Sequence, residues 1–219
     1  MTNDRREGEL MELTELSCKD FTKELAAKKP IPGGGGAAAL GGSLGVALNM
    51  MVVNFSKGKK NLIQFEKEHE DILDRGEKLR LKLLNLVEED AKNFEPLSKA
   101  YSMPSSSEEE RKLKEKAMEK YLKVACNAPL ETMELVYEGI LLHEELLDMA
   151  AKIIISDIGV GVQFLKAALN SAYLNVLINV NSIKDRTYVE SVRERTEEIL
   201  DRGNKKADEI YSKVLKMLG

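Results

Sequence analysis

The sequence predicts an all-α protein, a single-domain antiparallel bundle of about six helices. Three observations predict it. Apolar residues recur every three or four positions over long stretches, no stretch alternates with the period of two typical of strands, and the breaks between stretches are short and rich in Pro, Gly or Ser. The chain has 219 residues, a length that suits one domain. We therefore expect a single domain over residues 1–219, in which residues 1–12 form a loosely ordered polar lead-in.

The charge balance and the cysteines restrict the partners and the compartment. The chain carries 33 basic and 37 acidic residues, a net charge of −4, and shows no basic stripe, so we expect no nucleic-acid partner. The first ten residues are polar and charged, unlike a secretory signal. Cys18 and Cys126 lie far apart without a partner motif, which predicts buried or half-buried thiols in a reducing compartment. The expected localisation is cytoplasmic.

The first half of the chain contains three predicted helices. One begins near Ser17 and ends before Pro30. The run Gly33–Gly36 then leads into an uncharged helix over 37–55, which is short for a membrane span and rich in glycine. We therefore expect a buried core helix there and no membrane partner. A basic turn at 57–61 precedes a long helix over 62–101, whose apolar seam carries one carboxylate, Asp90.

The second half contains the remaining helices. The Ser-rich stretch 102–107 is the clearest loop, and Ser106 or Ser107 can cap the next helix, with Glu109 or Glu110 three residues on. Pro129 predicts a break and the start of a new helix that continues to about residue 151. A nearly all-apolar helix follows over 160–180, and an amphipathic one over 187–218. So much apolar surface predicts a homodimer.

The glycine run has two interpretations. It matches neither the phosphate-loop pattern nor the dinucleotide fingerprint, because no Lys-Ser or Lys-Thr follows and a helix, not a strand, precedes it. A flexible loop that feeds a helix start can still bind an anion through free N–H groups and the positive end of the helix dipole. A tight turn required only for packing fits the pattern equally well.

Asp90 is the strongest candidate for chemistry. A buried carboxyl has a raised pKa, which suits proton transfer or the stabilisation of a cation. A structural carboxylate that pairs with a neighbouring polar group is the alternative. Its neighbours Glu88 and Glu89 are expected to face water.

Other polar residues are ambiguous when taken alone. Asn175 and Asn179 share one face of an apolar helix, and they either clasp a neighbouring helix or hold a polar ligand. Asp157, after Ser156, is explained by helix-start chemistry. The lysines at 57, 59 and 60 are explained by a solvated turn. Both histidines, at 69 and 143, are expected at the surface, and neither has the spacing of a zinc motif, so no metal site is predicted.

Five segments taken together resemble the formiminotetrahydrofolate cyclodeaminase and methenyltetrahydrofolate cyclohydrolase family. They occur in order and cover nearly the whole chain: Pro32–Leu48, Gly58–Asn61, Glu89–Ala91, Ser156–Gly161, and Leu174–Asn179 with Ser182–Asp185. Two positions depart from the family pattern. Gly36 stands where a serine is usual, and Leu177 stands where an arginine is frequent.

The resemblance implies an all-helical, commonly dimeric enzyme without a bound cofactor, whose substrate is a tetrahydrofolate derivative. It implies release of ammonia from 5-formiminotetrahydrofolate to give the 5,10-methenyl cation, or hydrolysis of that cation to 10-formyltetrahydrofolate. It assigns Asp90, and after it Asp157, to catalysis. Substrate binding falls to the following residues: Gly33, Gly34, Gly35, Gly36, Lys59, Lys60, Ser156, Asn175 and Asn179.

Three rival functions make different predictions. A degenerate member would bind folate without turnover. A purely structural helical dimer would have no pocket beside Asp90. A nucleotide-binding enzyme would be stabilised by ATP or NAD.

Overall fold

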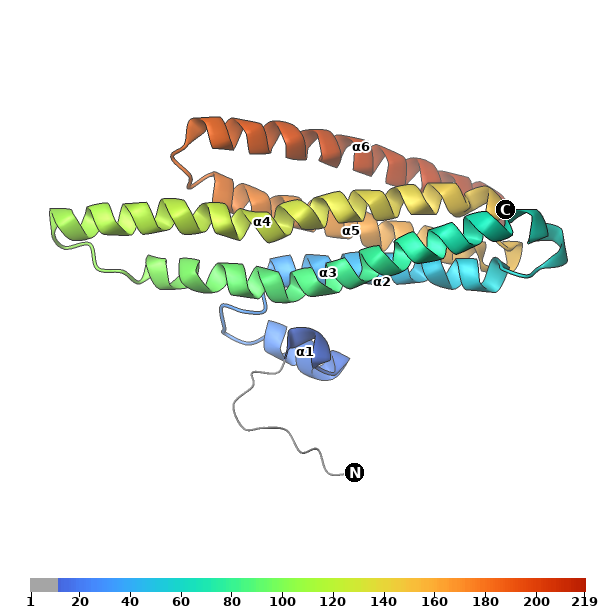
Figure 1. The fold of residues 1–219 in the computed structure, drawn as a ribbon, viewed down its shortest axis with the longest axis horizontal. Helices are drawn as coiled ribbons and strands as arrows, with labels where there is room; N and C mark the ends of the chain where they lie inside the picture. Colours follow the sequence, from blue (N-terminus) through green and yellow to red (C-terminus); the bar gives the residue numbers. More distant parts are fainter. Residues whose placement is uncertain (1–11) are drawn as a thin grey trace, which may run out of the picture.

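The computed structural model describes residues 12–219, and within that range the chain is helical without a strand. Five of the six α-helices run along one elongated antiparallel bundle, and the short α1 lies to one side of it (Figure 1). The predicted all-α bundle is confirmed, whereas the lead-in over 1–12 lies outside the described residues except for Glu12. The α-helices are α1 Cys18–Leu25, α2 Gly34–Ser56, α3 Glu66–Tyr101, α4 Glu108–Leu146, α5 Ile155–Val180 and α6 Arg186–Leu218; the 3-10 helices are η1 Leu13–Glu15, η2 Lys60–Phe65, η3 Leu147–Met149 and η4 Lys152–Ile154.

Helices α2 and α5 are antiparallel neighbours in the middle of the bundle, and glycines let them approach closely. A Cβ added at Gly45 would lie 2.6 Å from Leu165 Cγ of α5, and one added at Gly42 would lie 2.8 Å from Val136 Cγ2 of α4. Contacts below 3 Å leave no room for a side chain at either position. The small residues of α2 are thus required for the packing that holds its first turn in place.

One helix start has the predicted cap, and two others differ from the predicted starts by a few residues. The Ser107 side chain accepts a hydrogen bond from the Glu110 N–H while Glu110 bonds back to the Ser107 backbone, which is the predicted capping box. Helix α2 begins at Gly34, three residues before the predicted start, so the glycines themselves form its first turn. Helix α3 begins at Glu66, because the residues before it form a 3-10 turn.

The predicted break at Pro129 is wrong, because α4 continues through it as one helix from Glu108 to Leu146. A proline inside a helix leaves the carbonyl four residues earlier without its usual donor, here Ala125. The Asn179 side chain of α5 donates a hydrogen bond to that carbonyl at 3.3 Å. A donor from a neighbouring helix therefore replaces the missing N–H.

Three polar residues that were expected at the surface are buried. His69 and His143 are fully buried; His69 Nε2 contacts the Met149 carbonyl, and His143 Nδ1 contacts the Gly139 carbonyl, both at 2.9 Å. Glu88 is buried because its carboxylate accepts hydrogen bonds from the Thr14 N–H and hydroxyl, which ties the N-terminal segment to α3. Cys126 is buried as expected, whereas Cys18 is exposed.

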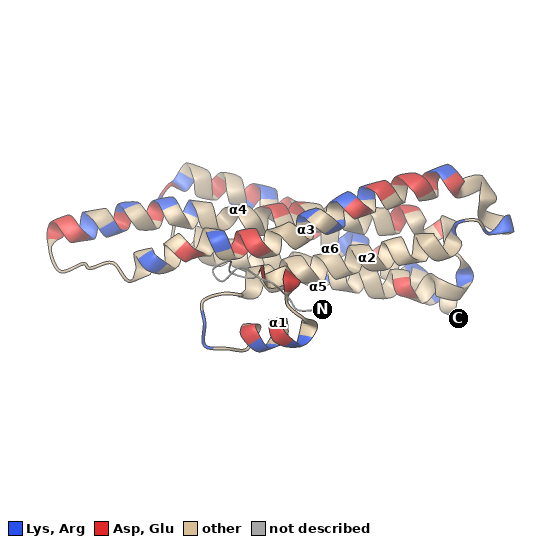
Figure 2. Cartoon of the chain, turned by 60° about the horizontal axis from the view of Figure 1, so that its bottom comes forward, with Lys and Arg blue, Asp and Glu red and all other residues tan. Residues whose placement is uncertain are grey.

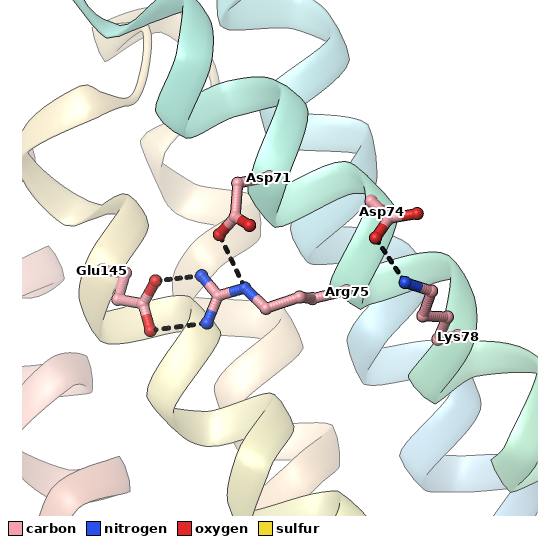
Figure 3. Close-up of polar contacts among 5 residues, drawn as sticks. All are labelled: Asp71, Asp74, Arg75, Lys78 and Glu145. Carbon is pink, nitrogen blue, oxygen red and sulfur yellow. Dashed lines mark hydrogen bonds and ion pairs between the residues drawn. The ribbon is translucent and has the colours of Figure 1, made fainter.

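Charged side chains follow the outer helices and are nearly absent from α2 and α5 (Figure 2). On α3, Arg75 pairs with Asp71 and, across to α4, with both oxygens of Glu145 (Figure 3). Helix α2 and the segment 152–180 are long and apolar enough to span a membrane by composition, and about half of each window, 56% and 50%, is buried in the bundle. Each of the two helices buries one of its sides in the bundle, as predicted for a core helix.

Candidate active site

A cavity of about 210 Å³ lies where the start of α2 meets α3 and the last turns of α5. Five of the residues that the resemblance assigns to the site, three glycines and two asparagines, line it together with Asp90. The full lining comprises Pro30, Ile31, Gly33, Gly34, Gly35, Asp90, Phe94, Ala125, Asn175, Ile178 and Asn179. Larger hollows exist elsewhere, but the one between α5 and α6 is almost wholly apolar. This cavity combines the glycine-lined N-terminus of α2 with the partly buried carboxylate of Asp90.

The Asp90 carboxylate is held against the first turn of α2. Its Oδ2 accepts a hydrogen bond from the Gly36 N–H at 3.0 Å. Its Oδ1 occupies the space beside Gly35, where an added Cβ would lie only 2.1 Å away. Gly35 must therefore be glycine for this arrangement. The first N–H groups of α2 have no partner within the helix, so this end carries partial positive charge.

Burial raises the pKa of the Asp90 carboxyl above its ordinary value, because the charged form loses solvation. The Gly36 N–H lowers this pKa by a smaller amount, since it stabilises the carboxylate. A carboxyl with a raised pKa binds and releases a proton closer to neutral pH than an exposed one. Asp90 is thus a partly buried carboxyl with a raised pKa on the wall of the cavity, where it could exchange a proton with a ligand.

Asn179 fills one of the two roles that the sequence left open, because it clasps a neighbouring helix, and the amide oxygens of Asn175 and Asn179 remain available for the other. Asn179 Nδ2 donates to the Ala125 and Asn175 carbonyls, and Asn175 Nδ2 donates to the Ser171 carbonyl. These bonds clasp α4 and fix both side chains. The amide oxygens receive no hydrogen bond from residues 12–219, and both side chains line the cavity. Two oriented acceptors are therefore available to a ligand that carries N–H donors.

Four predicted site residues lie at the other end of the same chain. Asp157 precedes Asn175 by 18 positions on α5, about 27 Å at 1.5 Å per residue. Ser156 is exposed beside it. Lys59 and Lys60 follow the end of α2, about 33 Å from its first residue by the same measure. One chain by itself does not bring these four residues to Asp90.

Sequence reasoning missed the apolar walls of the cavity. Phe94 follows Asp90 by one helical turn, and Ile178 lies between the two asparagines on α5, so helical spacing could have found both. Pro30 and Ile31 belong to the segment before α2, and only the folded chain shows that they close one side. At the departing position Gly36, an added Cβ would lie 4.0 Å from Asp90 Oδ2, within reach for a serine hydroxyl. Leu177 does not line the cavity.

Among residues 12–219, no three His, Cys, Asp or Glu side chains gather in a way that could hold a metal ion. The polar groups that face the cavity are one carboxylate, two amides and backbone N–H groups. These groups can transfer a proton, stabilise a nearby cation and orient a heterocycle with hydrogen-bond donors.

Several known proteins resemble this chain over most of its length. The family model for formiminotransferase-cyclodeaminase matches residues 17–198. A methenyltetrahydrofolate cyclohydrolase from Methylorubrum extorquens is 34% identical over 194 residues, which cover 89% of this chain and 93% of that protein. A formimidoyltransferase-cyclodeaminase from Rattus norvegicus is 28% identical over 200 residues, 91% of this chain and 37% of that longer protein.

A solved structure has the same fold. The formiminotetrahydrofolate cyclodeaminase of Thermotoga maritima superposes with a TM-score of 0.77 at 33% identity, over 94% of this chain and 98% of that one. The family match spans most of the chain, and both full-length relatives exceed 30% identity. The chain belongs to the formiminotransferase-cyclodeaminase family.

Proposed function

We propose that this protein converts 5-formiminotetrahydrofolate to 5,10-methenyltetrahydrofolate with release of ammonia. The observation that carries the proposal is the position of Asp90, a carboxyl with a raised pKa at the floor of a cavity, next to two fixed amides. The likeness to the Thermotoga cyclodeaminase over nearly the full length supports this reaction.

The reaction needs one proton shuttle. N10 of the folate attacks the formimino carbon on N5, and a tetrahedral carbon bridges the two nitrogens. N10 then gives up its proton, the amino group gains one, and ammonia leaves as the carbon–nitrogen bond to it breaks. Asp90 takes the first proton and delivers the second. Its carboxylate then stabilises the methenyl cation that forms.

Asn175 and Asn179 orient the substrate in this proposal. Their free amide oxygens accept hydrogen bonds from the N–H groups of the pterin ring, while Phe94 and Ile178 supply apolar contact to its faces. Asp157 then has no part in the chemistry of its own chain's cavity, because the length of α5 separates it from Asp90.

Cyclohydrolysis is the second candidate reaction. In it, water attacks the methenyl cation and the ring opens to 10-formyltetrahydrofolate, through a tetrahedral carbon of the same kind. The observation that favours it is the 34% identity to the Methylorubrum cyclohydrolase, which matches this chain over 93% of its length. Asp90 would then accept a proton from the attacking water.

An absorbance assay separates the two reactions and tests both. Methenyltetrahydrofolate absorbs where the formimino and formyl forms do not, so cyclodeamination produces an increase and cyclohydrolysis a decrease. Turnover of the formimino substrate supports our proposal, and turnover of the methenyl substrate alone supports the second. Folate binding without turnover of either compound would indicate a binding protein.

The decisive variant is Asp90→Asn, which keeps the shape of the side chain but removes its proton transfer. We expect turnover to fall by at least about a hundredfold, the scale for loss of a general acid or base. Circular dichroism provides the control for folding. Turnover like that of the wild type would remove Asp90 from the mechanism.

We also propose that the enzyme is cytoplasmic, acts as a homodimer and holds no resident cofactor. The reaction as written needs only protein groups and substrate. Turnover should therefore survive dialysis against EDTA, and a loss that added metal restores would contradict this part of the proposal.

A further inference from the structure

Two fully buried polar side chains in the bundle interior have atoms without a hydrogen-bond partner among residues 12–219. Asn49 of α2 and His143 of α4 are both 0% exposed. Neither Nδ2 nor Oδ1 of Asn49 makes a hydrogen bond, and neither does Nε2 of His143. Folded proteins seldom leave buried polar atoms unpaired, because such atoms lose their hydration without compensation. Each of these three atoms therefore needs a partner.

The helix register places the two side chains at the same level of the bundle. An added Cβ at Gly139 of α4 would lie 3.1 Å from Val46 Cγ2 of α2, so these two residues face each other. The two helices run in the same direction (Figure 1). One turn further along both helices, at three or four residues per turn, Asn49 stands opposite His143.

The neighbours of Asn49 on α2 show that its side chain points toward α4. Leu48 faces α5, since an added Cβ at Gly161 would lie 3.2 Å from Leu48 Cβ. Met50 faces α3, since an added Cβ at Gly76 would lie 2.9 Å from Met50 Cγ. Successive side chains of a helix point about 100° apart, so Asn49 points between these two directions. Helix α4, which packs on both α3 and α5, occupies that direction.

Helix α5 closes the same level beside the imidazole ring. His143 Nε2 lies so near to Gly161 that an added Cβ there would be only 2.3 Å from it. A side chain at position 161 would therefore displace the ring. The unpaired atoms of Asn49 and His143 thus face one small region that is enclosed by α2, α4 and α5.

The other ring nitrogen of His143 defines what Nε2 can bind. Nδ1 lies 2.9 Å from the Gly139 carbonyl, and a carbonyl only accepts, so Nδ1 carries the proton. Burial lowers the pKa of His143 to about 4, so the ring is neutral at neutral pH and Nε2 is an acceptor. The Asn49 amide offers N–H donors at Nδ2 and an acceptor at Oδ1. A small molecule that both donates and accepts hydrogen bonds matches this set.

We infer that Asn49 and His143 bind an internal water molecule between α2, α4 and α5. The water donates a hydrogen bond to His143 Nε2 and accepts one from Asn49 Nδ2, and Asn49 Oδ1 offers a further acceptor. Buried waters in proteins make two to four such bonds. One imidazole and one amide are too few ligands for a structural metal ion.

The bound water has a structural role in this inference. Helix α2 carries no charged residue, and its packing on the other helices is mostly apolar. A satisfied polar network adds directional bonds, which select one arrangement of the helices. The water therefore fixes the rotation and register of α2, whose first turn holds the Asp90 carboxylate. The inference does not depend on the identity of the substrate.

The first test uses the isotope-labelled wild-type protein and nuclear magnetic resonance. We expect a nuclear Overhauser effect between water and the Hδ2 proton of His143, which is next to Nε2 and remote from the exchangeable proton on Nδ1. The methyl groups of Leu169, which is also fully buried, should show no such effect. A scalar coupling across a direct Asn49 Nδ2–H···Nε2 bond, without transfer from water, would overturn the inference.

The second test uses the sign of a change in thermal stability. Asn49→Leu keeps a similar volume but removes the water's second partner, which leaves His143 Nε2 without a donor. We expect Tm to fall by at least about 3 °C and the Overhauser effect to disappear. In a site without water, the same change would remove an unpaired amide and raise Tm. A raised Tm, or an Overhauser effect that persists in Asn49→Leu, would overturn the inference.

A double variant separates the lost water from a packing defect. Asn49→Leu/His143→Leu leaves no unpaired polar group at this level, so its Tm should exceed that of Asn49→Leu. A further fall would show that packing, not water, causes the first effect, and would overturn the inference. Thr132→Val is the matched control, because this buried hydroxyl of α4 already bonds to the Ala128 carbonyl of its own helix. It should leave the Overhauser effect at His143 unchanged.

Discussion

At the scale of single residues, the site depends on two adjacent glycines with different requirements. An added Cβ at Gly35 would collide with the Asp90 carboxylate at 2.1–2.6 Å, whereas one at Gly36 would meet Val87 at an ordinary 3.5 Å. The Asp90 carboxylate thus requires glycine at position 35 but leaves room for a side chain at position 36.

This difference predicts opposite results for two alanine variants. Gly35→Ala should displace the carboxylate and lower kcat at least about tenfold, because the general acid–base leaves its position. Gly36→Ala keeps the N–H donor and should retain turnover and thermal stability. Steady-state kinetics and thermal denaturation measure both, and a fully active Gly35→Ala enzyme would contradict the geometry described here.

The raised pKa of Asp90 predicts a conflict between activity and stability. A folded-state pKa above the unfolded value means that the folded protein holds this proton more tightly, so stability from this group is lost as pH rises through that pKa. Asp90→Asn removes the buried charge and should raise Tm at pH 8. The gain should shrink as the pH falls and the wild-type carboxyl becomes protonated as well.

The buried His143 predicts a loss of stability in acid. Burial lowers the pKa of His143 from 6.5 to about 4. Between these two pH values the unfolded chain binds a proton at this residue and the folded chain does not. Stability should fall as pH drops below 6.5, by up to about 1.4 kcal/mol per pH unit. Urea denaturation at pH 7.5, 6 and 5 measures this slope, and His143→Gln should be flatter. Equal slopes would show that other groups cause the acid sensitivity.

At the scale of elements, a hydrogen bond between α4 and α5 connects the proline inside α4 with a residue that lines the cavity. Pro129 leaves the Ala125 carbonyl free, and Asn179 uses it to orient its own side chain. Asn179→Ala should therefore destabilise the wild type by about 1 kcal/mol, the typical net value of a hydrogen bond. In a Pro129→Ala background the helix supplies its own donor, and the same change should cost much less. A double-mutant cycle measures the difference, and additive effects would disprove the coupling.

Elements with strong local signals could be predicted from the sequence. The Ser107–Glu110 capping box and the 102–107 loop depend on residues within a few positions, and both are confirmed. The break at Pro129 was wrong because its solution, an amide 50 residues away, is not local. The burial of Glu88 was missed for the same reason, since its partner Thr14 lies 74 residues earlier.

At the scale of the whole molecule, the antiparallel topology explains which site residues meet in one chain. Asp90, the glycines and the asparagines could be grouped by the family resemblance, and the structure brings them together at one end. The same resemblance grouped Lys59, Lys60 and Asp157 with them, yet α2 and α5 carry these to the opposite end. A family pattern groups residues along the sequence but does not state how far apart the folded chain places them.

The attachment of the N-terminal segment has a further consequence. Thr14 binds Glu88, and Gly36 binds Asp90, so the intervening stretch begins and ends on a single turn of α3. Both ends of this segment are fixed on α3, so the segment can be treated as a closed loop. Doubling the length of a flexible loop raises its free energy of closure by only about 0.6 kcal/mol. Insertions at its exposed lysines, Lys28 and Lys29, would therefore alter access past Pro30 and Ile31 without disturbing the bundle. Changes in the length of this segment can therefore alter which substrates enter the cavity while the packing of the helices is unchanged.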